Sequence, residues 1–329
     1  MTDSPDDQLT PVRVSERAIP PPGTISQEAR EALSVGAAAP SASRPDPGDL
    51  EGWRVAVAAS EAMWAPIASE MLAGCASKVE TRTIAGVTCY VSTPAGLDAA
   101  ARGRVYLYIH GGALVFGGGE FAKGFGARTA DRLGITTVSV DYRMPPDHPF
   151  PAAPEDCLAV YLELIKTHDP GRVVVGGSSA GGNLAAAVTL MIRDRGLPLP
   201  GAVILLTPEV DLTESGDTFL TNELLDVTLK RGLPECNLLY ANGHDLTDPY
   251  VSPLFGDFSR GFPPTLIQSG TRDLFLSNSV MMHRKLRKAG VEAELHVWEA
   301  MPHGGFGFGE VPENQEINDE VARFIAHHC

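Results

Sequence analysis

Residues 177–181, Gly-Ser-Ser-Ala-Gly, form a G-x-S-x-G pattern with Ser179 at its centre. An apolar run rich in β-forming residues precedes the pattern over 172–175, and an apolar helical stretch follows it over 182–193. Between a strand and a helix, such small residues allow a sharp turn that exposes the serine hydroxyl beside the N–H groups of the helix start. The pattern predicts a nucleophilic serine. A simple tight turn or a glycine-rich phosphate loop is the alternative, although the Gly-Lys-Ser/Thr of a P-loop is missing.

A serine hydroxyl becomes a good nucleophile only when a base takes its proton and an acid orients that base. Among nine histidines, His303 stands out because it follows an expected strand over 293–298, in a Met-Pro-His-Gly-Gly-Phe loop. Asp273 follows the expected strand over 265–268 in the same way, and Asp211, after the preceding strand, is the rival acid. The order serine, aspartate, histidine is the one expected for such a serine turn. We therefore expect Asp273 to be the acid and Asp211 to cap its own loop or form a hinge.

The tetrahedral intermediate of acyl transfer carries an oxyanion, which needs N–H donors already in place. The sequence His-Gly-Gly-Ala over 110–113 directly follows an apolar run over 105–109, and its glycines let the backbone approach a substrate closely. Alone, this stretch would be no more than a turn. Together with the serine turn, it predicts an oxyanion hole made by the N–H groups of Gly111, Gly112 and Ala180.

The elements that must position these residues alternate along the chain. Short runs of β-forming residues predict strands over 79–83, 87–92, 105–109, 135–140, 172–175, 202–206, 265–268 and 293–298. Helical spacing of apolar residues predicts helices over 121–133, 153–166, 182–193, 278–289 and 317–326. Strands that alternate with helices in this way indicate an α/β fold, with a mostly parallel sheet covered on both faces.

Two segments interrupt the alternation. Residues 1–50 hold eight prolines and predict an extended arm with one short helix around 26–33, whereas helical spacing over 52–72 predicts one or two amphipathic helices. Almost 60 residues separate the strands ending near 206 and starting at 265, too many for a plain connection. We expect residues 1–75 to form an N-terminal arm and cap helices, 76–208 the first part of the core, 209–264 a cap insertion and return, and 265–329 the second part of the core.

Three residues are candidates for a substrate pocket. Met63 and Trp64 lie on an expected cap helix, where core packing is an equally good interpretation. Glu209 follows the strand over 202–206, and a carboxylate that points inward there would bind a substrate hydroxyl or a cation. The alternative is that Glu209 faces solvent.

Composition excludes several classes of function. The 329 residues carry 26 Lys+Arg and 41 Asp+Glu, a net charge of −15, which argues against nucleic acid and anionic membranes as partners. Five scattered cysteines without a C-x-x-C pair indicate free thiols in a reducing compartment rather than a disulfide scaffold or a zinc ribbon. The N-terminus is acidic and the apolar runs are too short to span a bilayer, so we expect a cytoplasmic protein. We also expect no metal site.

The negative charge is unevenly distributed. Residues 1–75 carry 5 Lys+Arg against 11 Asp+Glu, and residues 209–264 carry 3 against 10. The two expected cap segments thus hold thirteen of the fifteen excess negative charges. One hypothesis is an acidic rim that disfavours anionic substrates; a solvated outer cap face is the alternative.

Four motifs, in this order, resemble those of the bacterial hormone-sensitive lipase-like esterases. They are His-Gly-Gly-Ala over 110–113, Asp-Tyr-Arg-Met-Pro-Pro-Asp-His-Pro-Phe-Pro-Ala-Ala over 141–153, Gly-Ser-Ser-Ala-Gly-Gly over 177–182, and the segments of Asp273 and His303. The likeness extends from about residue 79 to the C-terminus. It implies an α/β-hydrolase core of eight strands, a helical cap, a Ser179–Asp273–His303 triad, no cofactor and, in many members, a homodimer.

The sequence departs from the family pattern at three points. Ser178 stands where the family usually has Asp or Thr, Ala113 stands where a Gly is usual, and Thr-Pro-Glu over 207–209 replaces the common Ser-Pro-Trp. We expect a serine carboxylesterase that hydrolyses small to medium neutral esters through an acyl-enzyme. A lactone hydrolase with the same triad is the runner-up, and a non-catalytic ligand-binding protein on the hydrolase fold is the third interpretation.

Overall fold

An eight-stranded sheet forms the centre of the molecule, and the computed structural model describes it with its helices for residues 12–39, 43–99 and 101–329. The strands are β1 (Lys78–Ile84), β2 (Val87–Thr93), β3 (Val105–Ile109), β4 (Thr136–Asp141), β5 (Val173–Ser178), β6 (Ala202–Leu206), β7 (Thr265–Gly270) and β8 (Ala293–Trp298). These strands confirm the eight predicted from the sequence. Parts of the expected N-terminal arm, 1–11 and 40–42, lie outside the described residues.

The order of the strands across the sheet is β1-β2-β4-β3-β5-β6-β7-β8. Among these strands, β2 pairs antiparallel with both β1 and β4, whereas the pairs from β4 through β3 to β8 are parallel. The predicted α/β fold with a mostly parallel sheet is therefore confirmed. Parallel strands end at the same edge of a sheet, so the residues that follow β3, β5, β7 and β8 come together there.

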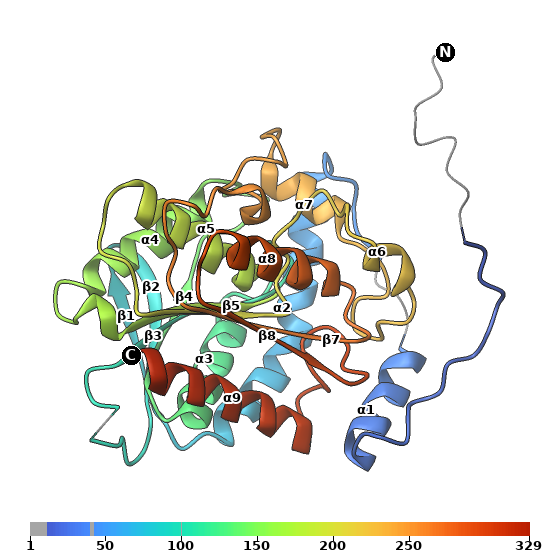
Figure 1. Cartoon of the computed structure of the whole chain (residues 1–329), viewed down its shortest axis with the longest axis horizontal. Helices are drawn as coiled ribbons and strands as arrows, with labels where there is room; N and C mark the ends of the chain where they lie inside the picture. Colours follow the sequence, from blue (N-terminus) through green and yellow to red (C-terminus); the bar gives the residue numbers. More distant parts are fainter. Residues whose placement is uncertain (1–11, 40–42, 100) are drawn as a thin grey trace.

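Helices cover both faces of the sheet, as Figure 1 shows. Helices α4 (Ala152–Leu164), α5 (Ala180–Asp194) and α8 (Leu276–Lys288) lie on one face, and α3 (Glu120–Leu133) and α9 (Pro312–His328) lie on the other. Short 3₁₀ turns, η2 (Pro170–Arg172) and η3 (Pro253–Phe255), connect some of the elements. Helix α9 begins five residues before the predicted start. Its first turn opens with Pro312 and is polar, so the apolar spacing on which the prediction was based does not extend to it.

The strands separate two apolar clusters by simple alternation. On β3, Leu107 and Ile109 pack toward α4 and α5, whereas Tyr106 and Tyr108 pack toward α9 and α3. Because both faces of a parallel sheet are covered, the central strands are apolar on both sides. This double layer of packing holds the ends of the central strands in place, and those ends carry the candidate site.

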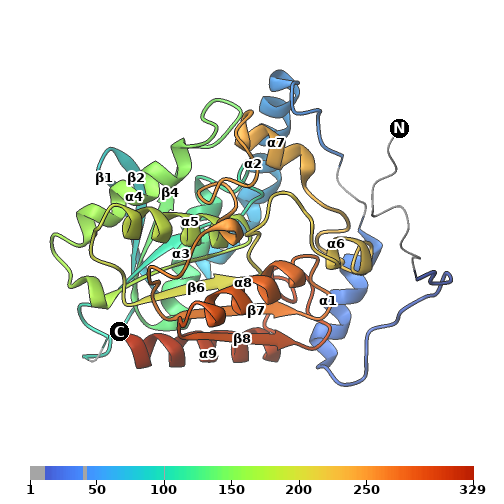
Figure 2. The same cartoon turned by 45° about the horizontal axis from the view of Figure 1, so that its top comes forward.

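The remaining helices are α1 (Gln27–Ala38), α2 (Leu50–Ala73), α6 (Thr218–Thr221) and α7 (Pro234–Ala241). Figure 2 shows α2 beside α7, although 160 residues, 74–233, lie between the two helices in the sequence. Trp53 of α2 is fully buried in one apolar cluster with Leu233 and Cys236 of the insertion and with Phe275, which follows β7. The N-terminal and inserted segments thus pack on each other and on a loop of the core.

Helix α2 is one helix of 24 residues, continuous through Pro66. Asp49 caps its start by accepting a hydrogen bond from the N–H of Gly52 at 2.9 Å, and Gly74 ends it. At the other side of the molecule, Ser26 at the start of α1 donates two hydrogen bonds of 2.7 Å to Glu313 of α9, one from its N–H and one from its hydroxyl. Within the described residues, no helix combines the length and the apolar composition needed to cross a bilayer.

Replacement of Trp53 by alanine tests how strongly α2 is held. The buried indole fills the space between α2, the insertion and Phe275, so Trp53→Ala should lower the free energy of unfolding by about 3–5 kcal/mol. Val55→Ala, an exposed position on the same helix, should change it by less than about 0.5 kcal/mol. Urea denaturation of both variants measures the difference, and equal effects would show that the Trp53 cluster does not hold the helix.

Candidate active site

Ser179 lies at the turn between β5 and α5, in a backbone conformation that is rare for a residue with a side chain. Its φ is 59° and its ψ is −123°. Such strain persists only where the surroundings hold it, and it is typical of functional positions. Here the N–H of Ser179 donates to the carbonyl oxygen of Leu206, at 2.9 Å, and the carbonyl oxygen of Ser179 accepts from the N–H of Asn183, at 3.1 Å.

The glycines on either side of Ser179 allow the turn to pack directly on the end of β3. A Cβ atom at Gly177 would lie 2.1 Å from the carbonyl oxygen of Ile109, and a Cβ atom at Gly181 would lie 2.0 Å from the same oxygen. Both distances are far below van der Waals contact, so only glycine fits at these positions. The two glycines of the G-x-S-x-G pattern are thus required by packing, and this confirms the predicted strand–turn–helix setting.

Asp273 and His303 form a buried pair after β7 and β8. The Nδ1 atom of His303 lies 3.1 Å from Oδ1 of Asp273, whose side chain is fully buried. Asp273 also accepts hydrogen bonds from the hydroxyl of Ser269 at 2.6 Å and from the N–H of Phe275 at 3.0 Å. Because the carboxylate accepts, Nδ1 carries the proton and Nε2 is left with a lone pair for a hydroxyl proton.

A second buried carboxylate, Asp226, holds the loops that carry this pair. One of its oxygens accepts from the N–H of Leu274 at 2.8 Å and from that of His303 at 3.1 Å. The other accepts from the N–H groups of Thr228 and Leu229 at 2.8 and 3.0 Å. Burial raises the pKa of Asp226 to about 6, and the nearby charge of His303 opposes this rise. Asp226 thus ties the inserted segment to the loops that carry Asp273 and His303.

Sequence reasoning missed Asp226, because its partners Leu274 and His303 lie 48 and 77 residues further along the chain. Local pattern contains no sign of such contacts. The one signal in the sequence is that an aspartate occurs within the inserted segment. The structure then shows that this segment packs on the loops after β7 and β8.

The expected oxyanion donors lie beside the serine turn. A Cβ atom at Gly111 would come within 2.8 Å of the carbonyl oxygen of Ser178, and Gly112 has a φ of 126° that favours glycine. Within the described part of the chain, no hydrogen-bond partner is found for the N–H groups of Gly111, Gly112 and Ala180. Ala180 is the first residue of α5, where a helix leaves its N–H groups free. All three donors are therefore available to a ligand.

The ring of His110 supports this loop from below. It is fully buried, stacks on Tyr142 with ring centres 4.1 Å apart, and its Nδ1 lies 2.8 Å from the carbonyl oxygen of Gly111. Burial lowers the pKa of His110 to about 4, so the ring is neutral near pH 7. The hydroxyl of Tyr142 in turn donates to the carbonyl oxygen of His110, at 2.9 Å. These contacts fix the backbone just before Gly111.

A cavity of about 500 Å³, called here the central cavity, brings the predicted residues together. Ser179, His303, Gly111 and Gly112 line it. The rest of its wall is mainly aromatic and aliphatic, with contributions from α2, α3, the insertion and the loop after β8: Trp64, Phe116, Phe121, Phe125, Leu229, Leu233 and Phe308. The structure therefore places the serine and the histidine at one hollow that suits an apolar ligand.

Of the three expected pocket residues, only Trp64 lines the central cavity. Met63, one residue earlier, is turned away by about 100° of helix rotation and is 60% exposed. Glu209 neither lines this cavity nor faces solvent; it is fully buried, and neither carboxylate oxygen has a hydrogen-bond partner among the described residues. Burial raises the pKa of Glu209 well above its usual value, and the neighbouring side chain of Asn237 opposes this rise.

The acidic insertion does not make an acidic cavity. Among the described residues, Arg44 is the one charged side chain that lines the central cavity, so the hypothesis of an acidic rim at the entrance is not carried into the wall of the cavity. Several carboxylates of the insertion instead serve the fold. Asp211 is fully buried and accepts from the hydroxyl of Ser215 at 2.7 Å and from the N–H of Thr213 at 2.9 Å, which is the loop-capping role expected for it.

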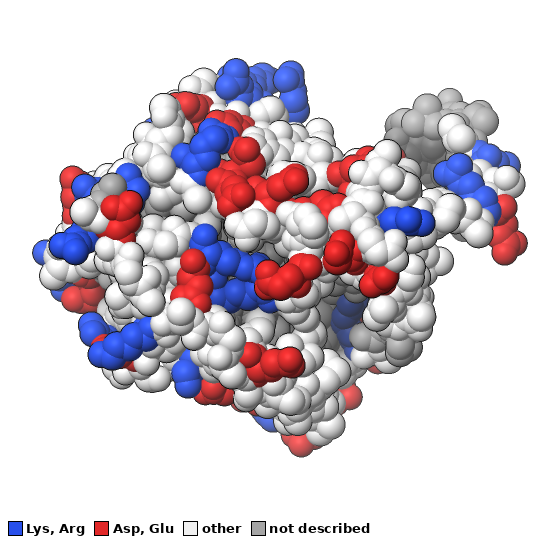
Figure 3. Space-filling model, turned by 90° about the horizontal axis from the view of Figure 1, so that it is seen from below, with Lys and Arg blue, Asp and Glu red and all other residues white. Residues whose placement is uncertain are grey.

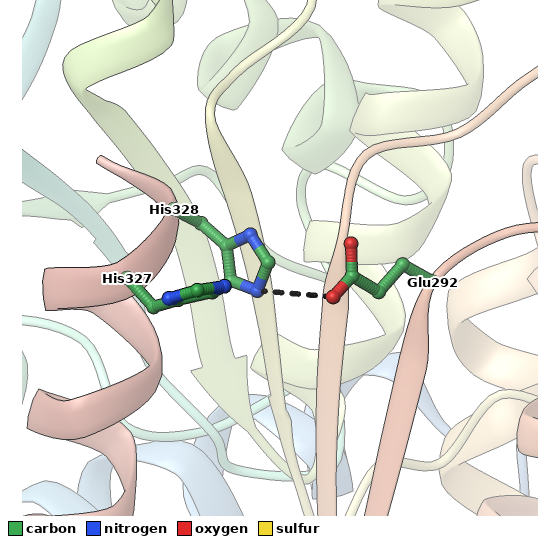
Figure 4. A group of neighbouring side chains, drawn as sticks. All are labelled: Glu292, His327 and His328. Carbon is green, nitrogen blue, oxygen red and sulfur yellow. Dashed lines mark ion pairs between the residues drawn. The ribbon is translucent and has the colours of Figure 1, made fainter.

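A separate cluster of potential metal ligands lies at the opposite end of the sheet. Figure 4 shows Glu292, just before β8, with His327 and His328 at the end of α9. The Nε2 atom of His328 lies 3.8 Å from Glu292, and the side chain of His328 is only 9% exposed, whereas His327 is exposed. The cluster lies before a strand, whereas the serine and histidine follow strands, so it does not belong to the central cavity.

Comparisons with known proteins agree with this geometry. The family described as the alpha/beta hydrolase fold matches residues 106–307. An acetyl-hydrolase of Streptomyces hygroscopicus is 35% identical over 229 residues, which cover 68% of this chain and 75% of the relative. The crystal structure of the esterase E25 is 35% identical, covers 97% of this chain and 99% of its own, and superposes with a TM-score of 0.90. A hormone-sensitive lipase from a metagenome library is 28% identical over 93% of this chain and 99% of its own, with a TM-score of 0.79.

The chain belongs to the α/β-hydrolase family, and within it to the bacterial hormone-sensitive lipase-like esterases. The resemblance drawn from the sequence motifs is thereby confirmed. The protein is a carboxylic ester hydrolase, like its relatives.

Asp226→Asn tests the carboxylate that ties the loops together. The amide offers one acceptor oxygen in place of two, so one pair of backbone N–H donors loses its partner. We expect kcat for p-nitrophenyl butyrate to fall by about 10- to 100-fold, because a small displacement of His303 is costly to catalysis. KM should change little. Asp217→Asn, an exposed position in the same insertion, is the control, and a similar loss in both variants would contradict the role of Asp226.

Glu209→Gln tests the buried unpaired carboxyl group. Since its pKa is raised in the folded chain, the stability that its proton contributes is complete below the unfolded pKa and is lost as the pH rises. Glu209→Gln removes this loss and should be more stable than the wild type by about 1 kcal/mol or more at pH 8. The difference should shrink towards pH 4. Urea denaturation across this range measures it, with exposed Glu223→Gln as the control.

Proposed function

We propose that this protein is a serine carboxylesterase that hydrolyses small to medium esters through an acyl-enzyme. One observation carries the proposal: a strained serine, an Asp-paired histidine and the free N–H groups of Gly111 and Gly112 border a single, mainly apolar cavity, and the N–H of Ala180 directly follows the serine. Each of these features has a role in acyl transfer, and a binding protein would need none of the three. The complete set of serine, histidine and aspartate therefore supports an enzyme rather than a non-catalytic ligand-binding protein.

In the proposed mechanism, Oγ of Ser179 attacks the ester carbonyl while Nε2 of His303 takes the hydroxyl proton. Asp273 holds the imidazole with its proton on Nδ1 and stabilises the imidazolium that forms. The negative oxygen of the tetrahedral intermediate accepts hydrogen bonds from the N–H groups of Gly111, Gly112 and Ala180. Collapse of the intermediate breaks the bond to the alcohol, which leaves with the proton from His303.

The second half of the reaction releases the acid. A water molecule gives a proton to His303 and attacks the acyl-enzyme at its carbonyl carbon. The second tetrahedral intermediate collapses, and the proton returns to Oγ of Ser179. Ring opening of a lactone would use the same steps, except that the alcohol stays attached to the acyl group. A substrate panel should therefore pair linear esters with lactones of similar size.

Ser179→Ala is the decisive variant. We expect wild-type protein to hydrolyse p-nitrophenyl butyrate and the variant to lose at least about 1,000-fold in kcat, because the attacking oxygen is removed. A fluorophosphonate probe should add its mass to the wild-type chain and leave Ser179→Ala unmodified. Exposed Ser34→Ala on α1 is the control and should keep full activity and labelling. An inert wild type, or a variant that keeps its activity, would refute the proposed function.

A further inference from the structure

Beside the central cavity lies a smaller cavity of about 140 Å³, called here the side cavity. It lies between α3, α9, the ends of the central strands and the loop after β8. Among the described residues, its wall contains Arg128 and Arg132 of α3 and no Asp or Glu. In a chain with a net charge of −15, a cavity wall with two cations and no carboxylate is an unusual concentration of positive charge.

The two arginines are poorly neutralised by the rest of the described chain. No ion pair within 4.0 Å and no hydrogen bond is found for the guanidinium of Arg132 among the described residues, and that of Arg128 contacts only the sulfur of Met71, at 3.9 Å. Burial, together with the neighbouring charge of Arg128, lowers the pKa of Arg132 to about 10. Burial also lowers the pKa of Arg128. Both groups keep their charge near pH 7, and each would gain from an anionic partner.

The carboxylates nearby do not fill this role. Asp131, between the two arginines in sequence, accepts hydrogen bonds from the N–H of Ala76 and the hydroxyl of Ser77. Glu310 interacts with both arginines only at longer range, and it is exposed to solvent. Both acids, together with Glu70, line an outer hollow of about 630 Å³ that the two arginines also line. Figure 3 looks onto the face that carries α9 and shows basic side chains near its middle with acidic ones around them.

The side cavity adjoins the site of acyl transfer. It shares wall residues with the central cavity, among them Ser178, next to the nucleophile, and Gly304, next to His303. Phe308 also belongs to both walls, is 43% exposed, and stands against Trp64 and Phe125 with ring centres 5.6 and 5.7 Å away. A substrate held at Ser179 therefore lies next to the side cavity, whose charged wall residues are arginines.

Uncharged polar groups complete the side cavity. The Oε1 atom of Gln268 is buried without a hydrogen-bond partner among the described residues, while its amide nitrogen donates to the carbonyl oxygen of Ile317, at 3.2 Å. Thr207 and Asn318 also line the wall. Such groups can bind the protonated or hydroxyl positions of a small polar ligand, in addition to the charge held by the arginines.

We propose that Arg128 and Arg132 form a subsite for a carboxylate group carried by the ester substrate. The inference rests on the proposed function, since it concerns the specificity of the same serine. It assigns to this protein esters with an anionic group beyond the scissile bond, such as half-esters of dicarboxylic acids. This is the opposite of the preference expected from the overall acidic charge.

Matched pairs of esters test the subsite. The first pair is mono-p-nitrophenyl glutarate and p-nitrophenyl butyrate, which places the charge on the acyl side. The second is 4-butanoyloxybenzoate and its methyl ester, which places the charge on the alcohol side. The readout is the ratio of kcat/KM for the anionic ester to that for its neutral partner, so that a general loss of activity cancels.

The variants Arg128→Met and Arg132→Met keep the length of the side chain and remove its charge. In the double variant, we expect the ratio for one of the two pairs to fall by about 10-fold or more, as for the loss of charge-assisted hydrogen bonds. Lys variants at both positions should retain a larger part of the ratio. Lys123→Met on the same helix, outside both cavities, is the control and should leave both ratios unchanged. Ratios that change by less than twofold in the double variant would overturn the inference.

A binding measurement separates this inference from the proposed function. Calorimetric titration of 4-butanoyloxybenzoate or mono-p-nitrophenyl glutarate into Ser179→Ala protein needs no turnover, and the arginine substitutions should weaken binding of one of them about 10-fold. If the wild type is inactive but the arginine substitutions still weaken binding, the proposed esterase function is refuted and the anion subsite is supported. Free glutarate that binds through both arginines, with unchanged ester ratios, would show a site for a separate anion and overturn the substrate role.

Discussion

The carbonyl oxygen of Ile109 is the point on which the active-site geometry depends. Gly177 and Gly181 both lie so close to it that no Cβ atom fits, and this approach lets the turn carry Ser179 at a φ of 59°. The same end of β3 leads into the loop with Gly111 and Gly112. One close backbone contact therefore sets the position of Ser179, the proposed nucleophile, relative to Gly111 and Gly112, two of the proposed oxyanion donors. The strain at Ser179 is held by the packing of the central strands between two layers of helices.

The histidine side of the site depends on a different kind of contact. Asp273 and His303 follow neighbouring parallel strands, so the sheet brings them to the same edge. Their loops are then held by Asp226, which accepts backbone N–H groups from both. The inserted segment thus holds the loops of Asp273 and His303 and also lines the cavity. Negative charge that seemed, from composition, to belong to the surface is used inside the fold at Asp226 and Asp211.

The charge around the cavities is consequently opposite to that of the whole chain. Arg44 comes from the N-terminal segment, donates to the carbonyl oxygen of Gly232 at 2.8 Å and pairs with Glu235 at 3.5 Å. Arg128 and Arg132 lack such close partners among the described residues. Local field, rather than net charge, acts on a bound substrate, because buried charges are screened far less than exposed ones. A net charge of −15 therefore says little about which esters the site prefers.

The sequence by itself determined the alternation of strands and helices, the serine turn and the loops of Asp273 and His303, because each depends on local spacing or on residues that directly follow a strand. It also determined the family, through four ordered motifs. Only the tertiary structure decided that Met63 points outward, that Glu209 is buried without a partner, and that Asp226 joins two loops far along the chain. It also decided that arginines are the charged residues that line the central and side cavities within the described chain. Burial and charge environment arise from residues brought together across the chain, and no local pattern contains that information.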